Sequence, residues 1–174
     1  MTVNHIVVNF YGAPGIGKTT AACSLYAELK KTNIAVELAA EFAKEKVLER
    51  NKTAMGYQKF IWANQCYRIH CAYQVAQVVI TDAPILLGAI YNKPLTPALK
   101  MVILEEHEQY NHLNIMLNRN HNHYDEASRH HTLDEAIQID EQIRSLLTDN
   151  NIPFIEYDSY TEDDLVQLIL ESVS

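Results

Sequence analysis

A glycine-rich segment near the start of the chain constrains its fold more than any other feature. Residues 12–19 read Gly-Ala-Pro-Gly-Ile-Gly-Lys-Thr and match the pattern G-x-x-x-x-G-K-[ST] at every fixed position. An apolar, β-branched stretch at residues 5–11 predicts a strand before it, and helical spacing of apolar residues predicts a helix at 18–31. A strand, a glycine-rich loop and a helix in this order are typical of a phosphate-binding loop, which implies a nucleoside triphosphate ligand.

The chemistry expected of this loop comes from its backbone and from two side chains. Glycines allow the backbone to wrap closely around phosphate, and the N-terminus of the following helix directs free N–H groups at the anion. We expect Lys18 to contact the β- and γ-phosphates of ATP and the Thr19 hydroxyl to bind Mg²⁺. The predicted nucleotide-binding residues of the loop are Gly12, Ala13, Pro14, Gly15, Ile16, Gly17, Lys18, Thr19 and Thr20.

Length and composition predict a single globular domain over residues 1–174. The chain has 48% hydrophobic and 21% charged residues, and no apolar run approaches the length of a membrane span. No signal-peptide pattern precedes the first predicted strand, so we expect a cytoplasmic protein without a membrane partner. The net charge of −8 argues against a large nonspecific nucleic-acid surface, because phosphate contacts need clustered lysines and arginines.

Hydrophobic periodicity predicts strands that alternate with helices along the whole chain. Strands are expected at residues 5–11, 34–40, 78–81, 112–118 and 153–157. Helices are expected at residues 18–31, 41–50, 55–77, 84–91, 97–109, from 132 onward, and at 161–173. Five strands interleaved with helices predict an α/β fold, a parallel sheet with helices on both faces.

Two carboxylates follow predicted strands and are expected beside the phosphate loop. Asp82 ends an apolar strand in the manner of a Walker B strand, and Glu41 follows the strand at residues 34–40. Open α/β sheets bind ligands at the carboxyl ends of their strands. We therefore expect Asp82 to bind Mg²⁺ together with Thr19, and Asp82 or Glu41 to orient or deprotonate an acceptor hydroxyl. The structural alternatives are a turn or cap residue for Asp82 and a helix N-terminal charge for Glu41.

A polar segment at residues 119–131 lies between the fourth predicted strand and the next helix. Phosphotransferases of this build place a lid there, whose arginines stabilise the transferring phosphoryl group and exclude water. Arg119 and Arg129 are the candidates for that role, with ordinary surface salt bridges as the alternative. Tyr160, after the last predicted strand, is a candidate for stacking on adenine, and packing beneath the last helix is an equal alternative. Four histidines in the segment also suggest zinc, but no cysteine accompanies them.

Together these features resemble the superfamily of P-loop nucleoside and nucleotide kinases. More narrowly, the chain is similar to small AAA-type kinase-like proteins of phages that are related to ribosylnicotinamide kinases. The matching segments are residues 12–19, 41–44, 79–84, 124–129, 134–136 and 139–140. One departure is Ser128, because members of the group often have glycine before the lid arginine.

The resemblance implies a P-loop kinase fold with a lid and the strand order 2-3-1-4-5, with ATP and Mg²⁺ as cofactors. The group includes phage enzymes that phosphorylate 5-hydroxymethyluracil within DNA, and such an enzyme would act in the host cytoplasm. The leading hypothesis is a kinase that transfers the γ-phosphoryl group of ATP to a nucleoside, a nucleotide or a modified base in DNA. The alternative is a P-loop ATPase or nucleotide-dependent switch that acts through a protein partner.

Three further observations concern the function and the surface of the chain. Asp82 is followed by Ala83 and Pro84, whereas many mechanical P-loop ATPases have a glutamate there to activate water, and this favours transfer to an acceptor. Arg68 is a candidate for contacting an acceptor phosphate, although a lone arginine is more often an ordinary surface residue. The predicted helix at 55–77 is rich in aromatic residues, which we expect in the core, with a homodimer interface as the alternative; they include Tyr57, Phe60, Trp62 and Tyr67.

Overall fold

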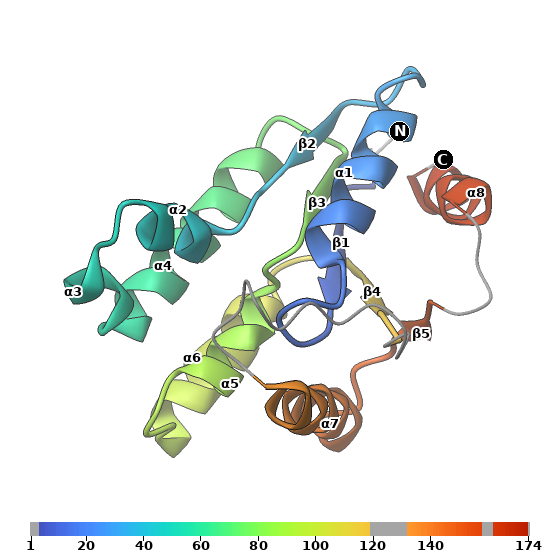
Figure 1. Cartoon of the computed structure of the whole chain (residues 1–174). Helices are drawn as coiled ribbons and strands as arrows, with labels where there is room; N and C mark the ends of the chain where they lie inside the picture. The colour runs from blue at the N-terminus through green and yellow to red at the C-terminus, as the bar shows by residue number, and fades with distance from the viewer. Residues whose placement is uncertain (1–3, 119–131, 158–161, 174) are drawn as a thin grey trace.

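The fold is built on a five-stranded sheet in a computed structural model that describes residues 4–118, 132–157 and 162–173. Every neighbouring pair of strands is parallel, and the order is β2-β3-β1-β4-β5 (Figure 1). The strands are β1 (Ile6–Tyr11), β2 (Val36–Leu38), β3 (Val78–Thr81), β4 (His112–Met116) and β5 (Ile155–Glu156). The predicted α/β class and strand order are confirmed.

Helical segments connect the strands and also follow the predicted order. They are α1 (Lys18–Leu29), α2 (Phe42–Leu48), α3 (Lys52–Met55), α4 (Gln58–Tyr73), the 3₁₀ turn η1 (Ile85–Leu87), α5 (Gly88–Tyr91), α6 (Pro97–His107), α7 (Leu133–Asp149) and α8 (Glu162–Val173). The helix predicted at 55–77 is shorter than expected, because α3 ends at Met55, with Gly56 as its C-cap, and α4 runs only from Gln58 to Tyr73. No helix in the described ranges is both long and apolar enough to span a bilayer.

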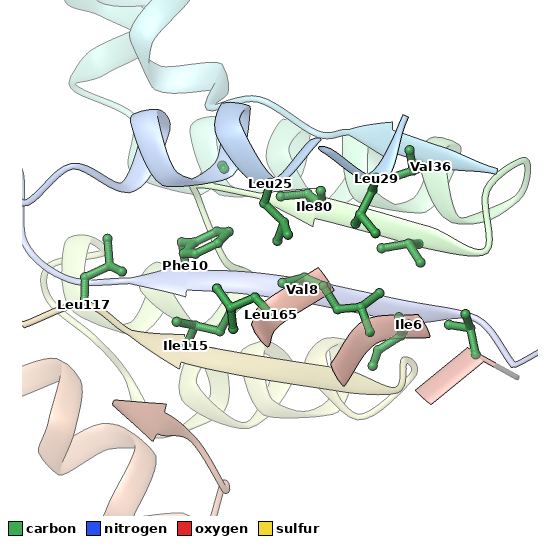
Figure 2. Close-up of a cluster of buried hydrophobic side chains, with 14 residues drawn as sticks. Ile6, Val8, Phe10, Leu25, Leu29, Val36, Ile80, Ile115, Leu117 and Leu165 are labelled. Carbon is green, nitrogen blue, oxygen red and sulfur yellow. The ribbon is translucent and has the colours of Figure 1, made fainter. Parts of the chain in front are cut away.

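Successive side chains of the central strand β1 point to opposite faces of the sheet, and a hydrophobic layer covers each face. Ile6, Val8 and Phe10 are buried on one face, where α1 and α8 cover them with residues such as Leu25 and Leu165 (Figure 2). Val7 and Tyr11 point to the opposite face, which α4, α5, α6 and α7 cover. The phosphate loop is therefore held between two packed layers at the carboxyl end of the central strand.

The expectation that the aromatic residues of α4 lie in the core is wrong for three of them. Tyr57, Phe60 and Tyr67 are 61%, 41% and 67% exposed. The side of α4 that faces the sheet is formed instead by Ile61, Gln65, Cys66 and Ile69. These aromatic side chains thus lie on the outer side of α4, where a homodimer interface remains a prediction.

Candidate active site

The phosphate loop joins β1 to α1 and is held open by glycine backbone geometry. Gly12, Gly15 and Gly17 have φ values of 137°, 88° and 102°, a region that L side chains rarely adopt. At Gly12 a Cβ atom would also lie 2.7 Å from Cγ2 of Ile16, so a side chain has no room there. Within the loop, the side chain of Ala13 is fully buried. Glycine at these three positions therefore allows the tight turn of the backbone immediately before α1.

The first turn of α1 offers donors to an anion. Gly17 is the N-cap and has no side chain with which to cap the first backbone N–H groups of the helix. Lys18 folds back over the loop and donates from Nζ to the carbonyl oxygens of Gly12, at 2.7 Å, and Ala13, at 3.2 Å. Thr20 lies in the same helical turn and is exposed. The ammonium group and the helix N-terminus thus converge on the space that a triphosphate needs.

Thr19 and Asp82 meet across the end of the sheet. The Thr19 hydroxyl donates to Oδ2 of Asp82 at 2.5 Å, and Asp82 is only 3% exposed. One hydroxyl and one carboxylate suit Mg²⁺, which prefers oxygen ligands and commonly takes the rest from water and phosphate. These residues fit the predicted metal site. Elsewhere in the described ranges, no three His, Cys, Asp or Glu side chains gather as metal ligands.

Glu41 begins α2 on the other side of Asp82. Its backbone N–H donates to Oδ1 of Asp82 at 3.0 Å, so one aspartate contacts both predicted partners. Burial raises the pKa of the Glu41 carboxyl above its usual value, the charge of Lys18 lowers it, and that of Asp82 raises it further. A carboxylate with a raised pKa beside a phosphate loop is suited to accept a proton.

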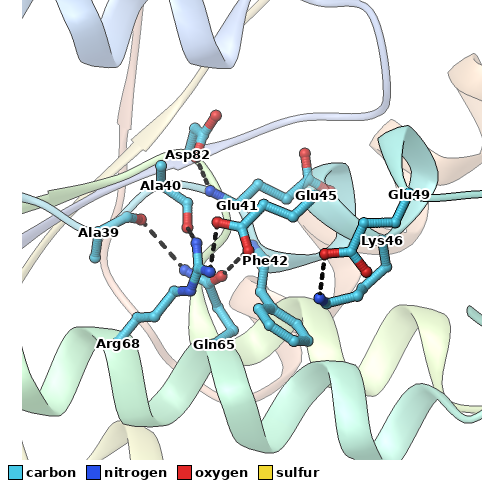
Figure 3. Close-up of polar contacts among 10 residues, drawn as sticks. All are labelled: Ala39, Ala40, Glu41, Phe42, Glu45, Lys46, Glu49, Gln65, Arg68 and Asp82. Atoms are coloured by element: carbon cyan, nitrogen blue, oxygen red, sulfur yellow. Dashed lines mark hydrogen bonds and ion pairs between the residues drawn. The ribbon is translucent and has the colours of Figure 1, made fainter. Parts of the chain in front are cut away.

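Helix α4 fixes the segment that carries Glu41, a contact that sequence reasoning missed (Figure 3). The buried Gln65 side chain accepts from the backbone N–H of Phe42 at 2.8 Å and donates to the carbonyl of Ala39 at 3.3 Å. Arg68 donates to the carbonyl of Ala40 at 3.3 Å and to Oε1 of Glu45 at 2.5 Å. Arg68 is therefore engaged in holding this segment, and a contact with an acceptor phosphate stays a prediction.

A pocket of about 390 Å³ opens between the phosphate loop and α4. Its walls are mostly apolar, with Trp62 and Tyr91 as aromatic sides and Glu41 as the acidic side chain. The complete lining is Pro14, Glu41, Ala43, Met55, Gln58, Ile61, Trp62, Gln65, Ala83, Pro84, Leu87, Gly88, Tyr91 and Asn92. The volume falls in the range of small-molecule sites, about 300–1,000 Å³.

Two contacts position Trp62 in the wall of this pocket. Its Nε1 donates to the carbonyl of Ile85 at 3.0 Å, and its ring lies against Gly88, where a Cβ atom would be 2.4 Å from Cδ1. Trp62 is the single tryptophan of the chain. Trp62 packs against the hydrophobic core, as the sequence predicts, and it also forms a wall of the pocket.

Several predicted site residues lie outside the described ranges. These are Arg119, Arg129 and Tyr160, together with the whole predicted lid at 119–131. The described residues instead add Asp140 of α7, which was not predicted: its Oδ1 accepts from the backbone N–H of Ala13 at 2.5 Å. The structure thus brings the phosphate loop, Thr19, Glu41, Asp82 and Asp140 together.

Comparisons with known proteins agree with this geometry. A family model described as an AAA domain matches residues 7–163. No curated protein matches the sequence significantly. Among solved structures, the NadR protein in complex with NR superposes with a TM-score of 0.67 at 17% identity, over 97% of this chain and 52% of that one. This chain therefore spans about half the length of the NadR structure.

A second similar structure is thymidylate kinase from Ehrlichia chaffeensis. It has a TM-score of 0.58 at 15% identity, and 98% of each chain is covered. At such identities the likeness establishes the fold alone, which is that of the P-loop kinases.

Proposed function

Because this chain belongs to the AAA domain family and has a P-loop kinase fold, we propose that it is a Mg²⁺-dependent kinase. It transfers the γ-phosphoryl group of ATP to a hydroxyl of an uncharged, nucleoside-type acceptor. The observation that carries this proposal is the pocket lined by both Pro14 of the phosphate loop and Glu41. A mostly apolar pocket of this size beside the phosphate loop suits a bound acceptor better than a water molecule.

The walls of the pocket support an acceptor with a planar ring. Trp62 and Tyr91 offer aromatic surfaces on which a base can stack, and Ile61 and Leu87 add apolar contact. Gln58 and Asn92, whose side chains carry amide groups, also line the pocket. One nucleoside, or one base turned out of a DNA strand, matches this combination of size and chemistry.

The charge of the pocket favours a neutral acceptor over a nucleotide. Among its described lining residues there is no lysine or arginine, and Glu41 is the one acidic residue. Of the cations nearby, Arg68 is engaged with Ala40 and Glu45, while Lys18 and Lys44 act on Glu41. A nucleoside monophosphate in this pocket would place its phosphate near a carboxylate without a lining cation, which is unfavourable. Free nucleosides and a hydroxymethylated base in DNA, such as 5-hydroxymethyluracil, both meet the requirement.

In the proposed reaction, each residue has a defined task. Lys18 and the N-terminus of α1 hold the phosphates, while Thr19 and Asp82 would hold Mg²⁺, which supplies charge neutralisation on the phosphate oxygens. Glu41 orients the acceptor hydroxyl and takes its proton. The acceptor oxygen bonds to the γ-phosphorus, the bond from that phosphorus to the bridging oxygen breaks, and ADP leaves. Arg119 and Arg129 are proposed to stabilise the transferring group, and Tyr160 to stack on adenine.

A P-loop ATPase or switch acting through a protein partner is the second candidate, because the matching family is described as an AAA domain. It requires hydrolysis without a small acceptor. The residues after Asp82 are Ala83 and Pro84, so no acidic side chain follows the Walker B aspartate to activate water. This feature favours the kinase.

A labelled γ-phosphate transfer assay tests the proposal. Separate reactions contain nucleosides, nucleoside monophosphates, DNA with 5-hydroxymethyluracil, or no acceptor, and Lys18→Ala is the inactive control. Label on a nucleoside or on the modified DNA is the expected result, and the two arms distinguish those acceptors. Label found only in free phosphate, at one rate in every reaction, would favour the ATPase. Transfer that persists in Lys18→Ala would exclude the proposed site.

A further inference from the structure

Helix α7 carries a carboxylate in the middle of its buried side. The buried residues of this helix are Ala136, Asp140, Ile143 and Leu147, which recur at helical spacing. Ile143 and Leu147 pack in the hydrophobic cluster with Tyr11 and Met116. Burying a carboxylate among such residues is costly unless it receives hydrogen bonds, so Asp140 needs a reason to be there.

One partner of Asp140 lies in the phosphate loop. Oδ1 of Asp140 accepts from the backbone N–H of Ala13 at 2.5 Å. On the other side of the same residue, the Ala13 carbonyl accepts from Nζ of Lys18 at 3.2 Å and from the N–H of Ile16 at 3.4 Å. The backbone of Ala13 is therefore held at both its N–H and its carbonyl group.

Helix α7 is itself fixed relative to the sheet. Thr132 and Glu135 form a capping box at its start, and Arg144 pairs with Glu156 of β5 and with Asn118 after β4. Asp140 and Arg144 are four residues apart and so project from one side of the helix. Figure 1 shows α7 beside the loop that follows β1. Helix α7 is thus attached to the sheet beside the loop that Asp140 contacts.

We propose that Asp140 is a positioning residue for the nucleotide: its carboxylate holds Ala13 so that the phosphate loop is shaped for a triphosphate before binding. This inference rests on the proposed nucleotide-binding function. The contact also occupies the N–H of Ala13, so in this proposal the N-terminus of α1 and not this N–H binds the phosphates.

An effect of the Asp140 charge and an effect of its hydrogen bond predict opposite changes in triphosphate affinity for the variant Asp140→Ala, and this difference provides the test. A negative charge near the loop repels a triphosphate, so an effect of charge alone predicts tighter binding whenever Asp140 is neutralised. Positioning by a hydrogen bond predicts that Asp140→Asn, which retains a side-chain oxygen acceptor, binds at least as well as wild type. It also predicts that Asp140→Ala binds more weakly, because Ala13 loses its acceptor.

The experiment measures the Kd of Mg²⁺-ATP by calorimetry, at a temperature where every variant is folded. Lys18→Ala is the control for the nucleotide site, and Asp149→Ala, an exposed position on the same helix, is the control for α7. We expect a Kd about tenfold higher for Asp140→Ala, as for the loss of one hydrogen bond to a charged group. Asp140→Asn and Asp149→Ala should stay within about twofold of wild type, or bind more tightly in the case of Asn.

A second readout uses the protein without ligand. Exchange of the Ala13 amide proton should be slow in wild type and Asp140→Asn and faster in Asp140→Ala, which also covers the case in which Asp140→Ala is too unstable for calorimetry. Unchanged affinity and exchange in Asp140→Ala would overturn the inference while leaving the nucleotide site intact. Failure of wild type to bind Mg²⁺-ATP would overturn the proposed function as well, so the two failures are distinct.

Discussion

Thr19 and Asp82 are joined by a hydrogen bond of 2.5 Å that connects the start of α1 to the end of β3. The other carboxylate oxygen of Asp82 accepts from the backbone N–H of Glu41 at 3.0 Å. One buried aspartate therefore links the proposed metal site to the proposed base. A change at Asp82 should affect both the metal and the acceptor.

The first prediction concerns Asp82. Asp82→Ala should lower kcat by about 10²–10³-fold, because the loss of one preorganised electrostatic partner typically has this effect. It should also raise the Mg²⁺ concentration needed for half-maximal rate. Thr19→Ser, which retains the hydroxyl, should stay near wild type. A normal Mg²⁺ dependence in Asp82→Ala would remove this residue from the metal site.

The second prediction is a pH dependence from Glu41. Burial raises the pKa of this carboxyl, so the ionised base is lost at a pH above the usual range of glutamate, and kcat/KM should fall there as the solution is acidified. Glu41→Gln should lower the rate by about 10²–10⁴-fold and remove this acidic limb. The pH–rate profiles of wild type and variant provide the measurement.

A variant of Asp82 tests what raises the pKa of Glu41. The charge of Asp82 raises the pKa of Glu41, so Asp82→Asn should move the acidic limb to lower pH. If the limb is unchanged in Glu41→Gln, another group is the base.

The sequence predicts the order of elements well and their ends poorly. The strand predicted at 153–157 is β5 only at Ile155–Glu156, since pairing with β4 is limited to Ile115 and Met116. Pro153 has no N–H to donate to a neighbouring strand, and its carbonyl accepts from the Asn114 side chain at 3.0 Å. Strand ends depend on the partner strand, and hydrophobic periodicity does not report it. The strand order came from the family resemblance.

Some residues of the candidate site could be predicted from the sequence and others could not. Thr19, Glu41 and Asp82 were predicted together because the ends of parallel strands converge, and they do lie together. Gln65 and Asp140 were missed because their partners, Phe42 and Ala13, are 23 and 127 residues away in sequence. A polar residue inside an apolar helical stripe was the available signal for Asp140, but only the folded chain shows which loop it contacts.

The third prediction concerns the close approach of Gly88 to Trp62. In Gly88→Ala the new methyl group would lie 2.4 Å from Cδ1 of Trp62, so the indole must move. We expect a loss of about 1–3 kcal/mol in the free energy of unfolding, as for other overpacked sites, and weaker acceptor binding. Gly56→Ala, whose new methyl would meet only the backbone oxygens of Lys52 and Thr53, at 3.3 and 3.6 Å, should be milder.

The single tryptophan makes this prediction easy to measure. Trp62 fluorescence should change when an acceptor enters the pocket, and its emission in Gly88→Ala should differ from wild type before any ligand is added. Identical emission spectra in the two proteins would show that the ring has not moved.

The fourth prediction concerns the stability of the fold in acid. His107 and His112 stack with ring centroids 3.6 Å apart, and Nε2 of His112 lies 2.6 Å from the carbonyl oxygen of His107. Burial and the neighbouring His112 lower the pKa of His107 to about 3. Burial lowers the pKa of His112 to about 4, although its hydrogen bond to His107 raises it.

Both histidines are therefore neutral in the folded protein at a pH where the unfolded chain, with a pKa of about 6.5, takes up protons. Their contribution to stability is complete above that pH and is lost as the pH falls toward the folded values. At pH 5 we expect a loss of up to about 2 kcal/mol for each histidine. Urea unfolding at pH 7.5 and pH 5 measures this difference. His107→Phe, which retains a ring, should reduce the acid loss by about half, whereas His70→Gln, at an exposed position of α4, should leave it unchanged. An equal acid loss in wild type and His107→Phe would assign the effect to other groups.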